Sequence, residues 1–358
     1  MDKENIKICY FGIYRPDFGR NKVYMDGLRQ NEVEIIECRD DSPGLKKYWN
    51  LWVKHRAIKN NYDFMIVGYP GHLVVPLAKI ISKKPVIFDA LCTLYEGEII
   101  SRGRFKFNPF GRAWILFVDW MAAKFADLIL VETNAQKNYF LKKFSLLDNK
   151  VVRVFTGANE DVFYEDPAVK KHTNFTAVFR GRLLPEAGVE HVVRAAKILE
   201  NERINFLIIG GGLLEEELQS VIEKVSPKNL VWIKDYLPDD EVRQRILECH
   251  VALGQMGKHE RLERTIPHKA FETLSMALPY ITARTVPIAE LFTDRKNCLL
   301  VEPANSEDLA KKILELKNSP DLASALAKSG NELYEELLTP AILANEIITA
   351  AQKLHLRK

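Results

Sequence analysis

Short apolar runs rich in β-branched residues alternate with segments of helical period along most of the chain. Such runs predict buried strands, and the amphipathic segments between them predict the helices that connect parallel strands. In the first half, the predicted strands are Ile6–Gly12, Val33–Cys38, Phe64–Val67, Val86–Asp89, Leu128–Glu132 and Val151–Phe155. The predicted helices are Asn21–Gln30, Lys46–Lys59, Leu73–Ile81, Gly111–Phe125 and Ala135–Phe144. This alternation is typical of a doubly wound α/β domain.

A charged stretch with Gly, Asn and Pro interrupts this pattern at residues 157–173 and predicts a linker. The pattern then resumes, with predicted strands at Ala177–Phe179, Phe206–Ile209, Val231–Ile233, Val251–Leu253, Tyr280–Thr282 and Cys298–Val301. We therefore predict two Rossmann-like domains facing a cleft, over residues 1–165 and 174–339. The last segment, 340–358, contains a predicted helix, Pro340–His355, that packs on its own domain or crosses back to the first one.

Composition places the chain among globular proteins. Of 358 residues, 51 are Lys or Arg and 48 are Asp or Glu, a net charge of +3. This excludes disorder, collagen-like repeats and a nucleic-acid binder driven by bulk charge. The five cysteines are scattered without a Cys-x-x-Cys pair, which argues against a disulfide framework or structural zinc and favours a reducing compartment.

Localisation follows from two further segments. Met1–Asn5 is polar and two-signed, unlike a secretory signal. The most apolar stretch, Ala113–Val131, contains Asp119, Lys124 and Asp127, which a membrane-spanning helix would not tolerate. We expect a cytoplasmic protein without a transmembrane segment.

Three glycines, 210–212, follow a predicted strand and precede a helix rich in Glu. A dinucleotide fingerprint would need glycine where Glu215 stands, and Gly257-Lys258 is followed by His259 instead of Ser or Thr, so a P-loop is also absent. Two interpretations stay open: a tight strand-to-helix turn, or a backbone that approaches a nucleotide at Gly211.

The segment 265–281 carries the clearest candidate chemistry. Pro267 suits a first helical position, so the free N–H groups of the first turn can bind phosphate oxygens. His268 and Lys269 add positive charge there, which is favourable when an anion is bound. Glu272, one turn on, can accept hydrogen bonds from two ribose hydroxyls. The alternative is a glutamate on a solvated stripe.

The segment 179–189 places Arg180, Arg182, Gly181 and Gly188 after the first strand of the second domain. Arginine offers forked donors to a diphosphate, and glycine lets the backbone come close to a ligand. A basic surface loop is the alternative. Both this loop and the helix after Pro267 are expected at the same edge of the same sheet.

In the first domain, three polar residues are candidates for the acceptor side. Asn21 follows the loop after the first strand, and Asp89 ends the fourth predicted strand. Asp89 can orient a sugar hydroxyl or assist proton transfer, or it can cap the next loop. His72, after Tyr-Pro-Gly, is the third, although a structural role fits it better.

Aromatic residues lie among cations in two stretches, Arg102–Trp114 and Lys46–Arg56. The first has four cations and no acid. This composition fits docking on an anionic lipid surface or an acceptor-binding rim, with a solvated loop and helix as the alternative. The interleaved aromatics that single-stranded nucleic acid needs are not present.

Together, these segments resemble the GT-B glycosyltransferases, in particular the family 4 retaining enzymes with a "glycosyl transferases group 1" donor domain. The resemblance rests on residues 180–191, 207–212, 235–238, 266–281 and 289–303, in the expected order, and more weakly on 88–90, 126–135 and 154–163. It implies that the second domain binds a nucleotide-diphosphate sugar and that the first positions an acceptor.

The resemblance also implies roles for single residues. Glu272 matches the glutamate that holds the nucleotide ribose, and Arg182 matches the arginine that binds the diphosphate. The loop before Tyr236 borders the base. Gly12, at the end of the first strand, is assigned to the donor side.

Two positions depart from the family pattern. Arg264 stands where a first glutamate often contacts the donor sugar, with Glu263 one residue away, and Ala187 stands where a phosphate-binding lysine is usual. Lys269 or Lys258 would then supply the missing cation.

We therefore expect a retaining, metal-independent glycosyltransferase without a cofactor, in cell-surface polysaccharide or glycolipid biosynthesis, because no Asp-x-Asp pair for a metal is evident. Expected partners are a nucleotide sugar, a glycan or lipid-linked acceptor and, through 102–114, the inner face of a membrane, but no nucleic acid. The alternatives are a nucleotide-sugar epimerase, for which only Asp89 and Glu272 are candidate acid and base, and an inactive sugar-nucleotide-binding scaffold.

Overall fold

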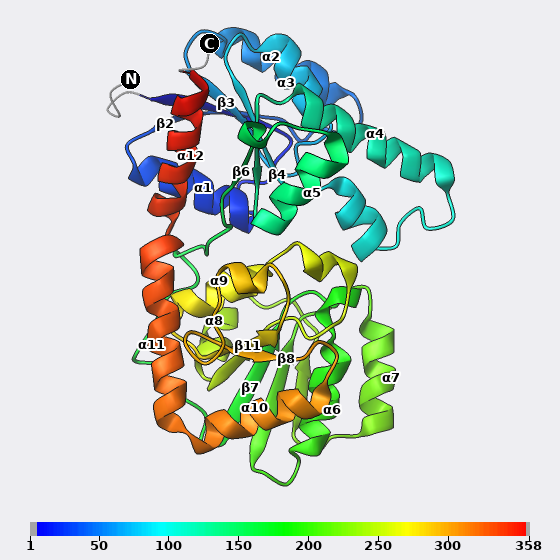
Figure 1. Cartoon of the computed structure of the whole chain (residues 1–358), viewed down its shortest axis with the longest axis vertical. Coiled ribbons are helices and arrows are strands. Elements are labelled where there is room, and N and C mark those ends of the chain that lie inside the picture. Colours follow the sequence, from blue (N-terminus) through cyan, green and yellow to red (C-terminus); the bar gives the residue numbers. More distant parts are fainter. Residues whose placement is uncertain (1–5, 356–358) are drawn as a thin grey trace. The chain divides into compact units, whose positions relative to one another are not determined.

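The chain forms two compact α/β units (Figure 1). This computed structural model describes residues 6–355, so the predictions for 1–5 and 356–358 lie outside it. The first unit comprises Met1–Gly157 and Leu338–Lys358, and the second comprises Ala158–Leu337. Each unit contains a sheet of six strands whose pairings are all parallel. The predicted pair of doubly wound α/β domains is thereby confirmed.

The first unit has the strand order β2-β1-β3-β4-β5-β6. Its strands are β1 (Lys7–Gly12), β2 (Glu34–Arg39), β3 (Phe64–Val67), β4 (Val86–Leu91), β5 (Leu128–Val131) and β6 (Val151–Arg153). Its helices are α1 (Gly19–Gln30), α2 (Lys46–Ile58), α3 (Val75–Ile81), the π-helix η2 (Tyr95–Ser101), α4 (Pro109–Phe125), α5 (Asn134–Phe144), the 3-10 helix η3 (Asp148–Lys150) and α12 (Pro340–His355). β3, β4 and β5 are buried along their whole length, as expected for a sheet covered on both faces.

The second unit has the strand order β12-β11-β10-β7-β8-β9. Its strands are β7 (Phe175–Arg180), β8 (Ile204–Ile209), β9 (Leu230–Ile233), β10 (Val251–Leu253), β11 (Tyr280–Ala283) and β12 (Leu299–Val301). Its helices are α6 (Val189–Ile198), α7 (Glu215–Val225), α8 (Asp239–Leu247), α9 (His268–Ser275), α10 (Ser306–Asn318), α11 (Pro320–Leu337) and the 3-10 helices η4 (Pro185–Ala187), η5 (Glu260–Glu263) and η6 (Ile288–Glu290). The order reverses between β7 and β10, where ligands of such sheets bind.

Several element ends differ from the predictions for local reasons. α4 begins at Pro109, two residues early, because the Asn108 side chain caps the helix by accepting a 3.0 Å hydrogen bond from the Gly111 N–H. Pro267 is the N-cap of α9 and not its first helical residue, since its ψ of 141° is extended. β4 continues to Leu91, so Asp89 lies inside the strand and does not end it.

The C-terminal helix α12 packs beside α1 within the first unit (Figure 1, red beside blue). Gly27 of α1 makes the close approach possible, because a Cβ there would lie 1.9 Å from the Pro340 carbonyl oxygen. The Asn31 amide donates a 2.8 Å hydrogen bond to the Ala341 carbonyl. Among residues 6–355, no helix combines the length and apolar character needed to cross a membrane.

Candidate functional site

The candidate site of the second unit lies where the strand order reverses. β7 and β10 pair directly, with Phe179 opposite Leu253. β7 ends at Arg180 and its loop begins at Gly181, and the segment after β10 leads into α9. Both predicted phosphate-binding segments therefore follow adjacent parallel strands, and their carboxyl ends share one edge of the sheet, as predicted.

Arg180 and Glu272 form the polar centre of this edge. The Arg180 Nη1 lies 2.5 Å from Glu272 Oε2, and both side chains are largely buried. The Arg180 guanidinium also stacks over the Phe163 ring at 5.1 Å. An ionised carboxylate accepts at both oxygens, so Glu272 can keep Arg180 on one oxygen and offer the other to ligand hydroxyls.

Lys269 lies against this ion pair. Its Nζ is buried, has no hydrogen-bond partner among the described residues, and lies 3.5 Å from the centroid of the Phe179 ring. Gly181 makes room for it, since a Cβ at that position would be 3.2 Å from the Lys269 Nζ. Burial lowers the pKa of Lys269 well below its usual range, and the Arg180 charge lowers it further against the opposing effect of Glu272. An anion bound here would reverse that shift.

Arg182 differs from Arg180 in having an exposed side chain. Its guanidinium makes no hydrogen bond or ion pair with any described residue, so it is available to a ligand. The loop then reaches Gly188, which has a left-handed φ of 61° and is the N-cap of α6. A Cβ at Gly188 would lie 2.1 Å from the Gly257 nitrogen, so only glycine lets the loops after β7 and β10 touch.

The three-glycine segment forms the tight turn that was one of its two interpretations. Gly210 has a φ of 124°, and a Cβ there would lie 2.3 Å from the Gly181 carbonyl oxygen. The Gly212 N–H donates a 2.6 Å hydrogen bond to Glu215 Oε1. The backbone N–H nearest α7 is therefore already hydrogen-bonded to the Glu215 carboxylate. The Gly211 carbonyl accepts a 3.0 Å hydrogen bond from the Leu183 N–H.

The remaining donor-side candidates lie farther out. Tyr236 is 90% exposed in the loop after β9. Lys258 lines an open hollow formed by the loops after β10, β11 and β12, together with Glu260 and Glu263. Arg264 pairs with both of these carboxylates, at 3.0 Å to Glu260 and 3.8 Å to Glu263. Of the two lysines proposed as replacement cations, Lys269 therefore lies at the Arg180–Glu272 pair and Lys258 does not.

In the first unit, Asp89 is fully buried and its carboxylate lies 2.8 Å from the Arg20 Nε. The Arg20 Nη1 also donates 3.1 Å hydrogen bonds to the Val154 carbonyl and the Thr156 hydroxyl. Burial raises the pKa of Asp89, and the Arg20 charge opposes that rise. Through Arg20, this carboxylate links β4 with α1 and with the segment after β6. Because the carboxylate has no exposed surface, contact with a substrate is disfavoured.

The other first-unit candidates also have internal partners. The buried Asn21 amide donates to the Arg15 and Tyr69 carbonyls at 3.0 and 2.7 Å, and so joins the loops after β1 and β3. His72 is buried and its Nε2 donates to the Cys92 carbonyl at 2.9 Å. Burial lowers the pKa of His72 to about 4, so it is neutral at pH 7. Gly12 ends β1 with a φ of 132°.

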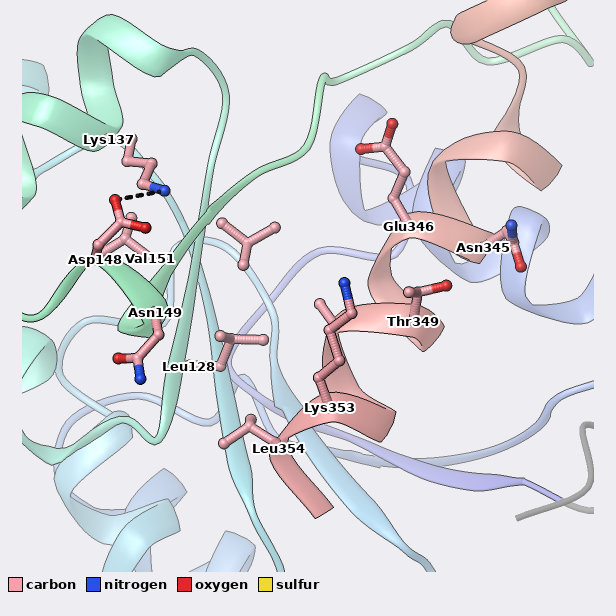
Figure 2. Close-up of a pocket in the computed structure, with 12 residues that line it drawn as sticks. Leu128, Lys137, Asp148, Asn149, Val151, Asn345, Glu346, Thr349, Lys353 and Leu354 are labelled. Atoms are coloured by element: carbon pink, nitrogen blue, oxygen red, sulfur yellow. Dashed lines mark ion pairs between the residues drawn. The ribbon is translucent and has the colours of Figure 1, made fainter. Parts of the chain in front are cut away.

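A pocket of the first unit lies away from all of these residues (Figure 2). The starts of β5 and β6, with Leu128 and Val151, form one wall, and Glu346, Thr349 and Lys353 of α12 form the other. Lys137 and Asp148 form an ion pair of 2.9 Å at its rim. Ligands of parallel sheets bind at the carboxyl ends of the strands, whereas this pocket lies at the amino ends of β5 and β6. We therefore interpret it as a gap between α12 and the sheet and not as a ligand site.

Comparison with known proteins shows which family part of the chain resembles. Residues 163–333 match the family described as "Glycosyl transferases group 1". The matched residues cover most of the second unit. The loop after β7, α9 and the Arg180–Glu272 pair all lie inside the matched residues.

Two relatives are similar in sequence over part of their length. An uncharacterized glycosyltransferase of Methanocaldococcus jannaschii, MJ1178, is 29% identical over 192 residues, 53% of this chain and 50% of that protein. The poly(ribitol-phosphate) alpha-N-acetylglucosaminyltransferase of Staphylococcus aureus is 24% identical over 227 residues, 60% of this chain and 42% of that protein. The chain spans about half the length of the curated relatives it matches. Both relatives carry the name of a glycosyltransferase.

Solved structures share the fold over nearly the whole chain. Anabaena HepE, in complex with UDP and glucose, superposes with a TM-score of 0.71 at 14% identity, covering 97% of this chain and 99% of that one. Sucrose-phosphate synthase of Thermosynechococcus elongatus gives 0.75 at 12% identity, covering 99% and 100%. These likenesses confirm the GT-B fold class.

Three residues with structural roles were not singled out from the sequence, two in the second unit and one in the first. Phe179 and Phe163 hold the Lys269 and Arg180 side chains by cation–π contact. In the first unit, Arg20 neutralises Asp89. Arg20 lies in the first turn of α1 and is buried. A basic residue on the side of a helix that faces the core needs a buried partner, and this was the signal in the sequence that could have pointed to Asp89.

Substituting Lys269 by Met is expected to stabilise the ligand-free protein, raising its melting temperature by about 2 to 4 °C, or ~1 kcal/mol. The pKa of Lys269 is lowered in the folded protein, so at pH values between this pKa and the usual lysine pKa the side chain is protonated in the unfolded chain but not in the folded one. The free energy of unfolding of the wild type therefore rises with pH in that range. The variant lacks this pH dependence. Thermal unfolding at pH 6 to 9 measures it, and Lys224→Met, an exposed lysine of α7, is the control. A variant no more stable than the control would contradict the assigned cost of burying Lys269.

Proposed function

We propose that the chain is a retaining glycosyltransferase that moves a sugar from a nucleotide-diphosphate sugar to a glycan or lipid-linked acceptor. The observation that carries the proposal is the cluster of Arg180, Arg182, Lys269 and Glu272 at the reversal of strand order, within the residues that match the glycosyl transferases group 1 family. Arg180 pairs with Glu272, Lys269 lies beside this pair, and Arg182 follows two residues after Arg180. This excess of positive charge suits a diphosphate, and the carboxylate suits the ribose next to it.

Each residue has a defined part in donor binding. Arg182, exposed and without an internal partner, clamps the diphosphate with its forked donors. Lys269 and the N–H groups of the first turn of α9 add positive charge behind it, next to His268. The free oxygen of Glu272 accepts from the ribose hydroxyls while Arg180 holds the other. Tyr236, in the loop after β9, borders the base.

The reaction needs stabilisation of the departing diphosphate. The bond between the sugar C1 and the diphosphate oxygen breaks, and a bond from C1 to the acceptor oxygen forms on the same face. The acceptor proton passes to the departing phosphate oxygen, so no protein base is required. Arg182, Lys269 and the helix N-terminus stabilise the negative charge that develops, the part a metal ion plays elsewhere. The proposed transferase is therefore metal-independent and needs no cofactor.

The relatives suggest where to look for the substrates. HepE was solved with UDP and glucose, and the S. aureus relative is named for transfer of N-acetylglucosamine to poly(ribitol phosphate). We propose a UDP-linked hexose or N-acetylhexosamine as the first donors to test, and a cell-surface polysaccharide or glycolipid as the acceptor class. A lipid-linked acceptor would bring the chain to a membrane surface, with residues 102–114 as the contact.

A panel of nucleotide sugars tests the proposal. The full chain is incubated with each sugar, with and without glycan acceptors, and products are separated by chromatography. Transfer, or slow hydrolysis that releases the nucleoside diphosphate, is expected. Interconversion of the sugar at C2 or C4 without release would indicate an epimerase, and binding without turnover would indicate a scaffold; either result would overturn the transferase assignment.

A further inference from the structure

Helix α4 and the loop before it expose large aromatic side chains to solvent. Phe107 is 92% exposed and Phe110 85%, and Trp114, Phe117 and Trp120 are each about half exposed. On α4, Phe110, Trp114 and Phe117 recur at i, i+4 and i+7, so they share one side of the helix. These five residues are called the aromatic face below.

Three rings of the aromatic face lie next to one another on α4. The ring centroids of Trp114 and Phe117 are 6.0 Å apart, and those of Phe117 and Trp120 are 6.1 Å apart with stacked planes. The opposite side of α4 supplies the core of the first unit through Val118, Ala122 and Ala123, so the aromatic face lies on the side of the helix turned away from that core. An exposed apolar patch of this kind marks an interaction surface.

Positive charge surrounds the aromatic face. Residues 102–117 contain Arg102, Arg104, Lys106 and Arg112 and no acidic residue. The Glu98 carboxylate pairs with both Arg102 and Arg104, at 3.1 and 2.6 Å, so one carboxylate is shared by two of the four cations. Arg112 donates to the Tyr95 hydroxyl instead of to an acid.

Neighbouring helices extend the same chemistry. α3 packs against both α2 and α4, so the three helices form one layer on the sheet (Figure 1). α2 exposes Trp49, whose ring lies 4.8 Å from that of Trp52, and begins with Lys46 and Lys47. The segment 45–60 likewise contains no acidic residue.

We propose that the aromatic face docks on an anionic lipid bilayer. Tryptophan and phenylalanine insert at the level of the headgroups, while arginine and lysine beside them bind lipid phosphates. The near absence of acidic residues around the face favours an anionic bilayer over a protein surface of mixed charge. The inference does not depend on the proposed transferase activity, since docking can occur without turnover.

Vesicle flotation of the full chain tests the proposal. Vesicles of phosphatidylglycerol and phosphatidylcholine are expected to carry the protein, and vesicles of phosphatidylcholine alone to carry at least tenfold less. The triple variant Phe107→Ser, Phe110→Ser, Trp114→Ser is expected to lose flotation at least tenfold.

A second triple variant, Arg102→Gln, Arg104→Gln, Lys106→Gln, is expected to lose flotation when the assay is run in low-salt buffer. Matched controls keep it: Leu147→Ser, an exposed apolar residue elsewhere in the first unit, and Arg194→Gln, Lys311→Gln, Lys328→Gln, three exposed cations of the second.

Fluorescence provides a second readout that folding defects do not imitate. Four of the five tryptophans lie on α2 and α4. Brominated lipids are expected to quench the wild type, and Trp114→Phe with Trp120→Phe should remove most of the quenching. Flotation unchanged in the aromatic variant would overturn the proposal. So would self-association that is lost in that variant while no vesicle binds, since the face would then join two copies of the chain.

Discussion

Glu272→Ala is expected to lower turnover with a nucleotide-sugar donor at least tenfold, an effect above ~1.4 kcal/mol on the activation barrier. The substitution removes the proposed ribose acceptor and leaves Arg180, now 2.5 Å from Glu272 Oε2, without its carboxylate. An unpaired guanidinium beside Lys269 would also distort the proposed diphosphate site. Initial rates at saturating and limiting donor measure whether binding or turnover is affected.

Three further variants separate these two effects. Glu272→Gln keeps the shape and one accepting oxygen, so it should retain more activity than the alanine variant. Arg180→Met with Glu272→Ala removes the unpaired charge and should recover stability but not turnover. Glu217→Ala, an exposed glutamate of α7, is the control. Wild-type turnover in Glu272→Ala would refute the assigned role.

Asp89→Ala is expected to destabilise the first unit by about 3 to 5 kcal/mol, because removing one partner of a buried ion pair leaves an uncompensated charge. Arg20 and Asp89 are both fully buried, and the other partners of Arg20 include the Val154 carbonyl and the Thr156 hydroxyl, which are neutral. Urea unfolding followed by tryptophan fluorescence measures the loss. In a Trp232→Phe background, the remaining tryptophans all lie in the first unit, so the signal reports that unit alone.

The companion variant replaces both charges. Arg20→Met with Asp89→Leu should be much closer to the wild type than Asp89→Ala, since a buried pair can be exchanged for apolar residues at small cost. If Asp89→Ala instead has wild-type stability and loses turnover, Asp89 is a reacting group after all, and the structural part assigned to it is wrong.

The strands were predictable because buried parallel strands are continuous apolar runs, and the position of the second-unit site followed from them. Once β7 and β10 are neighbours, Arg180 and Glu272 must share an edge. The sequence could not show that Arg180 pairs with Glu272 while the Arg182 side chain is exposed, because the two are arginines only two positions apart at the end of β7. Nor could it show that Asp89 points into the core, since β4 continues past it to Leu91 and pairs it with an arginine 69 positions away.

The central claim, a nucleotide-diphosphate site at the carboxyl edge of the second sheet, is tested most directly by calorimetric titration of the full chain and of Arg182→Ala with UDP, GDP and ADP. We predict saturable binding of at least one diphosphate to the wild type and at least tenfold weaker binding to the variant, which corresponds to ~1.4 kcal/mol. Equal binding by both proteins, or no binding of any of the three, would contradict the account.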